Sequence, residues 1–224
     1  MSTDGITEDD IAGYLANNPG FFERHAELLA SVQLSSPHGA RAVSLQERQM
    51  EMLRERIKGL EKKIMEMIRF GQDNMSIADR LHRWTRTVLY THQPVMLVPV
   101  MLHELQHQFM IPQAAVRVWG ASPEHADLPC ARPVTDDMRI FATSLVAPYC
   151  GANSGFEAAG WFEEPETVQS IALIPLRPAH AHQAFGLLAL GSPDPARYSP
   201  DMGVEFLQQV GDIAGAALTR LLPA

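Results

Sequence analysis

The stretch VQSIALIPLRPAHAHQAFGLLAL, residues 168–190, contains two apolar runs separated by a loop that includes Pro178. Both runs, Val168–Leu176 and Ala184–Leu190, are short and rich in aliphatic side chains. Short apolar runs bounded by turn residues are typical of buried β-strands. A third strand is expected over Ala114–Trp119, because Gly120 follows it directly and marks a turn.

Helical segments surround these three strands. The spacing of apolar residues predicts a helix over residues 95–109 and a second helix from Thr135, a favourable N-cap, to about Tyr149. Ser199-Pro200 is expected to begin a last helix, since proline is favoured at the first helical position. This order of elements predicts an α+β fold, an antiparallel sheet flanked by helices, over residues 91–224.

A seven-residue period begins at Val43 and dominates a helix predicted over residues 43–88. Isoleucine at the first heptad position and leucine at the fourth favour a parallel, two-stranded coiled coil. Residues 41–90 are therefore expected to form a homodimerisation helix, in which Arg56 of one chain attracts Glu61 of the other. The alternative is a long amphipathic helix packed on its own domain. The expected dimer seam consists of Met50, Leu53, Ile57, Leu60, Ile64 and Met67.

Residues 1–40 are expected to form a separate segment with two short helices. Thr7 and Asp10 have the spacing of a capping box at the start of the first helix. An apolar patch follows that is too small to bury itself, so it is a candidate docking surface for a partner protein. The patch consists of Phe21, Phe22, Leu28 and Leu29.

The composition excludes several classes of protein. The 224 residues have a formal net charge of −8, so we expect no nucleic-acid partner and no attraction to an anionic membrane. Two cysteines are too few for a disulfide framework or a four-cysteine zinc site. The sequence has no apolar run of transmembrane length and no signal peptide at its acidic N-terminus, so a cytoplasmic protein is expected.

His103, Glu104 and His107 match the HExxH pattern. In zinc proteases with this pattern, two histidines one helical turn apart bind zinc and the glutamate acts as general base. On a helical projection, however, both histidines lie opposite the apolar face, where bound zinc would face solvent. We therefore expect no metal site and no enzyme, and keep a zinc-dependent hydrolase as a remote alternative.

Aromatic and polar residues of the C-terminal segment are candidates for lining a ligand pocket. Arg117 and Trp119 alternate with valines, so they share one face of a strand. An arginine beside an aromatic side chain suits an anionic or planar ligand. Cys150 is expected near a helix C-terminus, which does not lower a thiol pKa, and so to be buried and unreactive. The full candidate set is Arg117, Trp119, Phe141, Tyr149, Cys150, Trp161 and Phe162.

Two sets of residues resemble known families. The segments Phe185–Ser192, Tyr198–Met202 and Phe206-Leu207 resemble the end of a GAF domain, where two final strands lead into a closing helix. Nearly the whole chain resembles a bacterial family of unknown function, numbered 484. The residues of that second resemblance are Tyr14-Leu15, Pro19, Phe21-Phe22, Leu28-Leu29, Pro37-His38, Ala42–Leu45, Glu47–Gln49 and Leu53-Arg54, together with Tyr149–Gly151, Gln169-Ser170 and Ile174–Leu176.

The resemblance implies a helical N-terminus, a coiled-coil helix and a GAF-like domain, without an established activity or cofactor. GAF domains elsewhere bind small molecules and pass a signal through flanking helices. We therefore expect a non-enzymatic small-molecule-sensing or regulatory module that dimerises through its coiled coil and acts through a partner protein. The alternative is a scaffold or adaptor whose pocket is filled by its own side chains, and an open cavity beside Arg117 would argue against that alternative.

Overall fold

The computed structural model describes residues 5–31, 45–178, 181–201 and 203–223. By its internal contacts the chain divides into two compact units, Met1–Lys63 and Ile64–Ala224. The expected three segments, with boundaries after residues 40 and 90, stay a prediction.

The first unit begins with the capping box expected from the sequence. The backbone N–H of Asp10 donates to Thr7 Oγ1 at 3.2 Å, and the hydroxyl and N–H of Thr7 donate to the Asp10 carboxylate. These hydrogen bonds lower the pKa of Asp10. Helix α1 (Glu8–Asn17) follows, and α2 (Phe21–Arg24) and α3 (Ala26–Ser31) come after it.

The predicted apolar patch lies on α2 and α3. The rings of Tyr14 and Phe22 both pack edge-on against Phe21, at centroid distances of 6.0 and 5.4 Å. Phe22 and Leu28 are exposed, whereas the side chain of Leu29 lies outside the described residues. Part of the patch is thus open on the described surface of this unit.

A single helix, α4 (Leu45–Tyr90), confirms the long helix predicted over residues 43–88, although Val43 itself lies outside the described residues. Its surface changes along its length. Trp84 and Val88, near the C-terminal end, are fully buried, whereas the apolar residues of the predicted seam are exposed. None of the described helices combines the length and the hydrophobicity of a transmembrane span.

The second unit contains one antiparallel sheet of four strands in the order β1-β4-β3-β2. The central strands β3 and β4 are buried along their whole length, because they carry the two apolar runs Val168–Leu176 and Ala184–Leu190. The strands are β1 (Gln113–Val118), β2 (Tyr149–Ala152), β3 (Ser170–Leu176) and β4 (Gly186–Ser192). The helices are α5 (Pro94–Phe109), α6 (Asp136–Ser144), α7 (Glu205–Leu218) and the short 3₁₀ helices η1 (Pro123–His125), η2 (Pro129–Ala131), η3 (Glu157–Trp161), η4 (Pro165–Thr167) and η5 (Thr219–Leu221).

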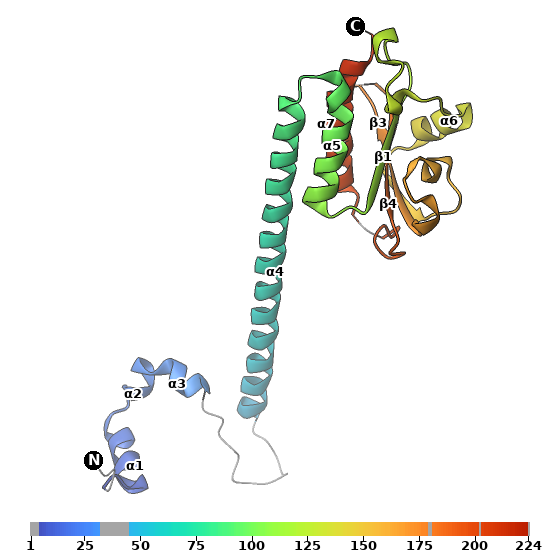
Figure 1. Ribbon diagram of the computed structural model, residues 1–224. Helices are drawn as coiled ribbons and strands as arrows, with labels where there is room; N and C mark the ends of the chain where they lie inside the picture. Colours follow the sequence, from blue (N-terminus) through green and yellow to red (C-terminus); the bar gives the residue numbers. More distant parts are fainter. Residues whose placement is uncertain (1–4, 32–44, 179–180, 202, 224) are drawn as a thin grey trace. The chain divides into compact units, whose positions relative to one another are not determined.

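Each face of the sheet has its own apolar core. One core joins Val116, Val118 and Leu190 to α5, α7 and the last turns of α4. The other joins Ala115, Leu187 and Ala189 to α6 and η3. Figure 1 shows α5 and α7 on one side of the sheet and α6 on the other. The structure therefore confirms the predicted α+β architecture.

Three elements, α6, β2 and α7, differ from the sequence-based expectation. Thr135 caps α6 as expected, with Met138 N–H donating to its hydroxyl at 3.2 Å, but α6 ends at Ser144. Tyr149–Ala152 instead forms β2, a strand too short to show a period of its own and defined by its pairing with β3. The last helix begins at Glu205, and Ser199-Pro200 lies in the preceding turn.

Candidate functional site

Two features of the surface are candidates for function: the seam of α4 and a groove along the edge of β1. The six seam residues, Met50, Leu53, Ile57, Leu60, Ile64 and Met67, are between 51% and 71% exposed. Since they recur at heptad spacing, they form one stripe along α4. Exposed apolar stripes of this kind are typical of interaction surfaces, so the stripe is a candidate interface.

The last turns of α4 are fixed to the sheet domain instead. Trp84 Nε1 donates to the carbonyl of Met101 in α5 at 3.0 Å, inside the core. The guanidinium of Arg220, after α7, donates to the carbonyls of Val88 and Thr91 at 3.3 and 3.0 Å. The alternative of a helix packed on its own domain therefore holds for this end of α4.

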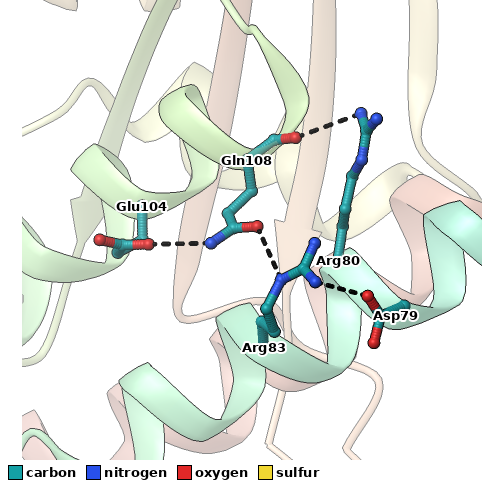
Figure 2. Close-up of polar contacts among 5 residues, drawn as sticks. All are labelled: Asp79, Arg80, Arg83, Glu104 and Gln108. Atoms are coloured by element: carbon teal, nitrogen blue, oxygen red, sulfur yellow. Dashed lines mark hydrogen bonds and ion pairs between the residues drawn. The ribbon is translucent and has the colours of Figure 1, made fainter.

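A polar network reinforces this attachment on the surface (Figure 2). Arg83 donates through Nη1 to Asp79 at 2.5 Å and through Nε to the side chain of Gln108 at 3.4 Å. Arg80 donates to the backbone carbonyl of Gln108 at 3.4 Å. The amide of Gln108 in turn donates to the carboxylate of Glu104 at 3.2 Å.

This network also shows how the residues of the HExxH pattern are arranged on α5. Glu104 is held on the side of α5 that faces α4, whereas His103 and His107 are exposed. Their rings stack on each other with centroids 6.4 Å apart. Among the described residues no group of three or more metal-ligating side chains gathers. The carboxylate of Glu104 therefore accepts a hydrogen bond from the side-chain amide of Gln108, whereas in a zinc hydrolase it would act as general base beside the metal bound by the two histidines.

The groove lies beside β1, which is an edge strand of the sheet. Its volume is about 390 Å³, and its walls come from α5, β1, η2 and the end of η3. Arg117 lies in it and donates through Nη1 to the carbonyl of Pro129 at 3.1 Å. The guanidinium also lies over the ring of Trp161, 5.4 Å from its centroid, which is a cation–π contact. The structure thus brings Arg117 and Trp161 of the predicted pocket together.

The charge of Arg117 is not matched by an acid. No ion pair to Arg117 or to the nearby Arg132 occurs within 4 Å in the described part of the chain. Burial lowers the pKa of Arg117, and repulsion from Arg132 lowers it further. Glu163 also lines the groove but does not pair with Arg117. The groove therefore presents partly desolvated positive charge.

The other residues of the predicted pocket lie elsewhere. Trp119 donates to the carbonyl of Ala184 at 2.9 Å and lines a separate hollow beside α6. Phe141 and Tyr149 pack against Phe156, with centroids 5.7 and 5.1 Å from its ring.

Phe162 and Cys150 are both buried. Phe162 packs so closely on β4 that a Cβ at Gly191 would lie 2.9 Å from its ring. Cys150 belongs to the core on the opposite face of the sheet, and burial raises the pKa of its thiol. The expectation of a buried thiol is confirmed, although Cys150 lies in a strand and not at a helix end.

Sequence reasoning missed several residues of the groove. Gln113 fixes the far end of the groove, where its amide donates to the Glu164 carbonyl at 3.0 Å and to Thr167 Oγ1 at 2.9 Å. Cys130, which lines the groove, and Arg132, which lies near Arg117, come from a proline-rich loop. No period or motif in that loop indicates that it returns to β1, so only the folded chain reveals their position.

The comparisons with known proteins concern the whole chain and the sheet domain. The model of the family DUF484, described as a protein of unknown function, matches residues 1–222. The uncharacterized protein YigA of Salmonella typhimurium is 26% identical over 226 residues, which cover 96% of this chain and 93% of that protein. Neither description assigns an activity.

Two solved GAF domains are also similar to the chain. One, from Pseudomonas syringae pv. tomato, has a TM-score of 0.46 at 17% identity and covers 69% of this chain and 92% of that chain. The other belongs to the phosphoenolpyruvate-protein phosphotransferase of Acinetobacter. It has a TM-score of 0.42 at 11% identity and covers 64% of this chain and 92% of that chain.

Proposed function

Because the chain belongs to the DUF484 family of proteins of unknown function, we propose a function from its own surface. The chain is a non-enzymatic, cytoplasmic regulatory module that dimerises through α4 and acts through a partner protein. Its ligand site is the groove beside Arg117.

The observation that carries this proposal is the exposed seam of α4. Six apolar residues at heptad spacing are more than half exposed, on a helix whose other end is anchored in a folded domain. A second copy of the same stripe covers these side chains in a parallel coiled coil, with isoleucine at the first heptad position and leucine at the fourth. The helix then joins two sheet domains into one module.

The groove supports a binding role over a purely structural one. An open volume of about 390 Å³ lies beside Arg117, within the range of ligand pockets in proteins. The sequence resemblance to GAF domains leads us to expect a small molecule there. Positive charge without an acidic partner and the flat ring of Trp161 favour an anionic occupant.

One observation favours the scaffold alternative. On the α6 side of the sheet, much of the face is filled by the chain's own side chains, including Phe162 and the cluster of Phe141, Tyr149 and Phe156. A module that binds nothing in its groove, yet still dimerises, would correspond to this alternative.

The test of dimerisation uses variants of the seam and a matched control. Leu53→Asp with Leu60→Asp places charges at two seam positions, and light scattering after size-exclusion chromatography should then report a monomer. Met52→Asp with Met65→Asp changes two equally exposed apolar residues that lie off the seam, and this control should remain dimeric. A seam variant that stays dimeric would contradict the coiled coil.

A separate measurement addresses the zinc hydrolase. The protein purified without chelator should contain the same amount of zinc as the His103→Ala, His107→Ala double variant. One zinc per chain in the wild-type protein and none in the double variant would support the zinc-hydrolase alternative.

A further inference from the structure

A second pocket, of about 310 Å³, lies at the C-terminal end of α5 and shares no lining residue with the groove beside Arg117. Its walls come from α4, the end of α5, strand β4 with the turn that follows it, and the start of α7. Seven of its nine lining residues are aliphatic or aromatic, and the other two are Arg80 and Arg197. The pocket is therefore apolar except where these two arginines meet it.

The apolar part of the pocket reaches the core of the sheet domain. Ile111, Leu190 and Leu207 line it, and all three are buried members of the core on the α5 side of the sheet. Phe109 and Phe206 are half-buried beside them, with ring centroids 4.7 Å apart. An apolar group in this pocket would leave water and contact core side chains directly, which favours its binding.

The two arginines are fixed at the last carbonyls of α5. Arg80 Nη1 donates to the Gln108 carbonyl at 3.4 Å (Figure 2), and Arg197 Nη2 donates to the Phe109 carbonyl at 3.0 Å. The guanidinium of Arg197 also lies over the ring of Tyr198, 5.9 Å from its centroid. Since the two carbonyls are consecutive, both guanidinium groups meet the same helix end.

The charge of these arginines is not neutralised by the protein. Neither forms an ion pair in the part of the chain that the structure describes, whereas Arg83 on the same helix pairs with Asp79. The end of α5 offsets only part of the two charges, because the negative end of a helix is equivalent to about half an elementary charge. Each guanidinium has five N–H donors, of which the bonds to α5 use one.

We propose that this pocket binds a monocarboxylate with an apolar body, such as a medium-chain fatty acid. The carboxylate pairs with Arg80 and Arg197, and the apolar body lies against Phe109, Phe206 and Leu190. The inference goes beyond the proposed function, because it assigns a second ligand site that needs neither the dimer nor the groove beside Arg117.

The two kinds of wall are the reason to favour an amphipathic ligand. A small inorganic anion would pair with the arginines but would leave the apolar side chains in contact with water. A neutral apolar molecule would cover those side chains but would leave the guanidinium donors unused. A carboxylate on an apolar body satisfies both, since a carboxylate accepts charge-assisted hydrogen bonds from arginine. Because Ile77 and Arg80 come from α4, such a ligand also contacts the long helix and the sheet domain together.

The first test titrates the full chain with octanoate and follows the methyl groups by NMR. The signals of Ile111, Leu190 and Leu207 should shift and reach saturation, whereas those of Val98 and Leu102, which line the groove beside Arg117, should not move. Saturating shifts of Val98 and Leu102 alone would place the ligand in that groove and overturn the assignment. The absence of any saturable shift would overturn it as well.

Three matched probes separate the two parts of the ligand. Octan-1-ol has the same chain without the charge, octylammonium reverses the charge, and acetate keeps the carboxylate without the chain. Each should bind at least about tenfold more weakly than octanoate, which is the factor that one charge-assisted hydrogen bond or a few buried methylene groups supply. Octan-1-ol or acetate that binds as tightly as octanoate would show that the arginines or the apolar walls take no part, and would overturn the proposal.

Protein variants test the arginines. Arg197→Gln should weaken octanoate binding about tenfold, because it removes one of the two charges. Arg83→Gln is the matched control, since Arg83 does not line the pocket, and it should leave binding unchanged. Equal binding by Arg197→Gln and the wild-type protein would contradict the role of the charge.

A further variant keeps the test decisive if Arg197→Gln fails to fold. Ile77 lines the pocket and is 41% exposed, three residues before Arg80 on α4, so Ile77→Asp places a carboxylate where it pairs with Arg80 and repels the ligand. It should weaken octanoate binding at least about tenfold. Met75→Asp, at an exposed position of α4 outside the pocket, should leave binding unchanged. Binding that survives Ile77→Asp would overturn the proposal.

Discussion

The indole of Trp84 in α4 donates a hydrogen bond to the carbonyl oxygen of Met101 in α5, at 3.0 Å, and both residues are fully buried. This bond joins α4 to α5 and thereby to the sheet domain. The contribution of this hydrogen bond to the free energy of unfolding measures how firmly α4 is attached to the sheet domain.

Trp84→Phe should lower the free energy of unfolding by about 1–3 kcal/mol, because it removes a buried hydrogen bond and leaves a void where the larger indole packed. Urea denaturation measures the change. Trp119→Phe is the matched control, since Trp119 donates a similar bond to Ala184 at 2.9 Å but is partly exposed. Equal losses of unfolding free energy in both variants would show that the buried bond of Trp84 contributes no more than the partly exposed bond of Trp119.

The orientation of the dimer can be tested through Arg56. In a parallel coil Arg56 lies opposite Glu61 of the partner subunit, so Arg56→Glu should raise the dissociation constant several-fold at low salt. Adding Glu61→Arg should restore it, which analytical ultracentrifugation would show. In an antiparallel coil the second change would bring no recovery.

Two glycines should respond to alanine in opposite ways. A Cβ at Gly215 in α7 would lie 2.9 Å from the backbone oxygen of Arg177, so Gly215→Ala should destabilise the protein by about 1–3 kcal/mol. At Gly59, in α4, no atom lies within 4 Å of the added carbon. Gly59→Ala should therefore stabilise the helix by up to about 1 kcal/mol. Thermal unfolding followed by circular dichroism compares the two, and a stabilised Gly215→Ala would show that α7 does not pack closely on β3.

The hydroxyl of Tyr198 is buried and has no hydrogen-bond partner among the described residues. Tyr198→Phe should therefore leave the protein equally stable at pH 7 or stabilise it, by up to about 2 kcal/mol, because an unsatisfied polar group leaves the core.

The same residue predicts a pH dependence. Burial raises the pKa of Tyr198 above its usual value of about 10. As the pH rises through the pKa of the unfolded phenol, the unfolded state loses this proton and the folded state keeps it. The free energy of unfolding therefore falls in that range. Tyr198→Phe should reduce this loss, whereas Tyr90→Phe, at an exposed position, should not. Chemical denaturation between pH 8 and 11 measures the difference.

The sequence predicted those elements whose signals are local. The capping box of Thr7 and Asp10, the heptads of α4 and the apolar runs of β3 and β4 each depend on neighbours within one or two turns or along one strand. Such patterns determine the type of an element, and here they determined the α+β class and the exposed stripe on α4.

Strand β2 and the end of α6 could not be predicted in this way. Tyr149–Ala152 has neither length nor alternation, and it becomes a strand because β3 offers it a ladder of hydrogen bonds. Once it is a strand, Cys150 turns to one core and Tyr149 to the other, so the predicted pocket divides between the two faces of the sheet.

By itself, then, the sequence determined which segments form helices and central strands, though not every end of a helix, and that α4 carries an apolar seam at heptad spacing. Only the tertiary structure decided that β1 is an edge strand and that Arg117 meets Trp161 there. The physical reason is that periodicity reports which side of an element is apolar. Which strand ends the sheet depends instead on long-range pairing, which no local pattern encodes.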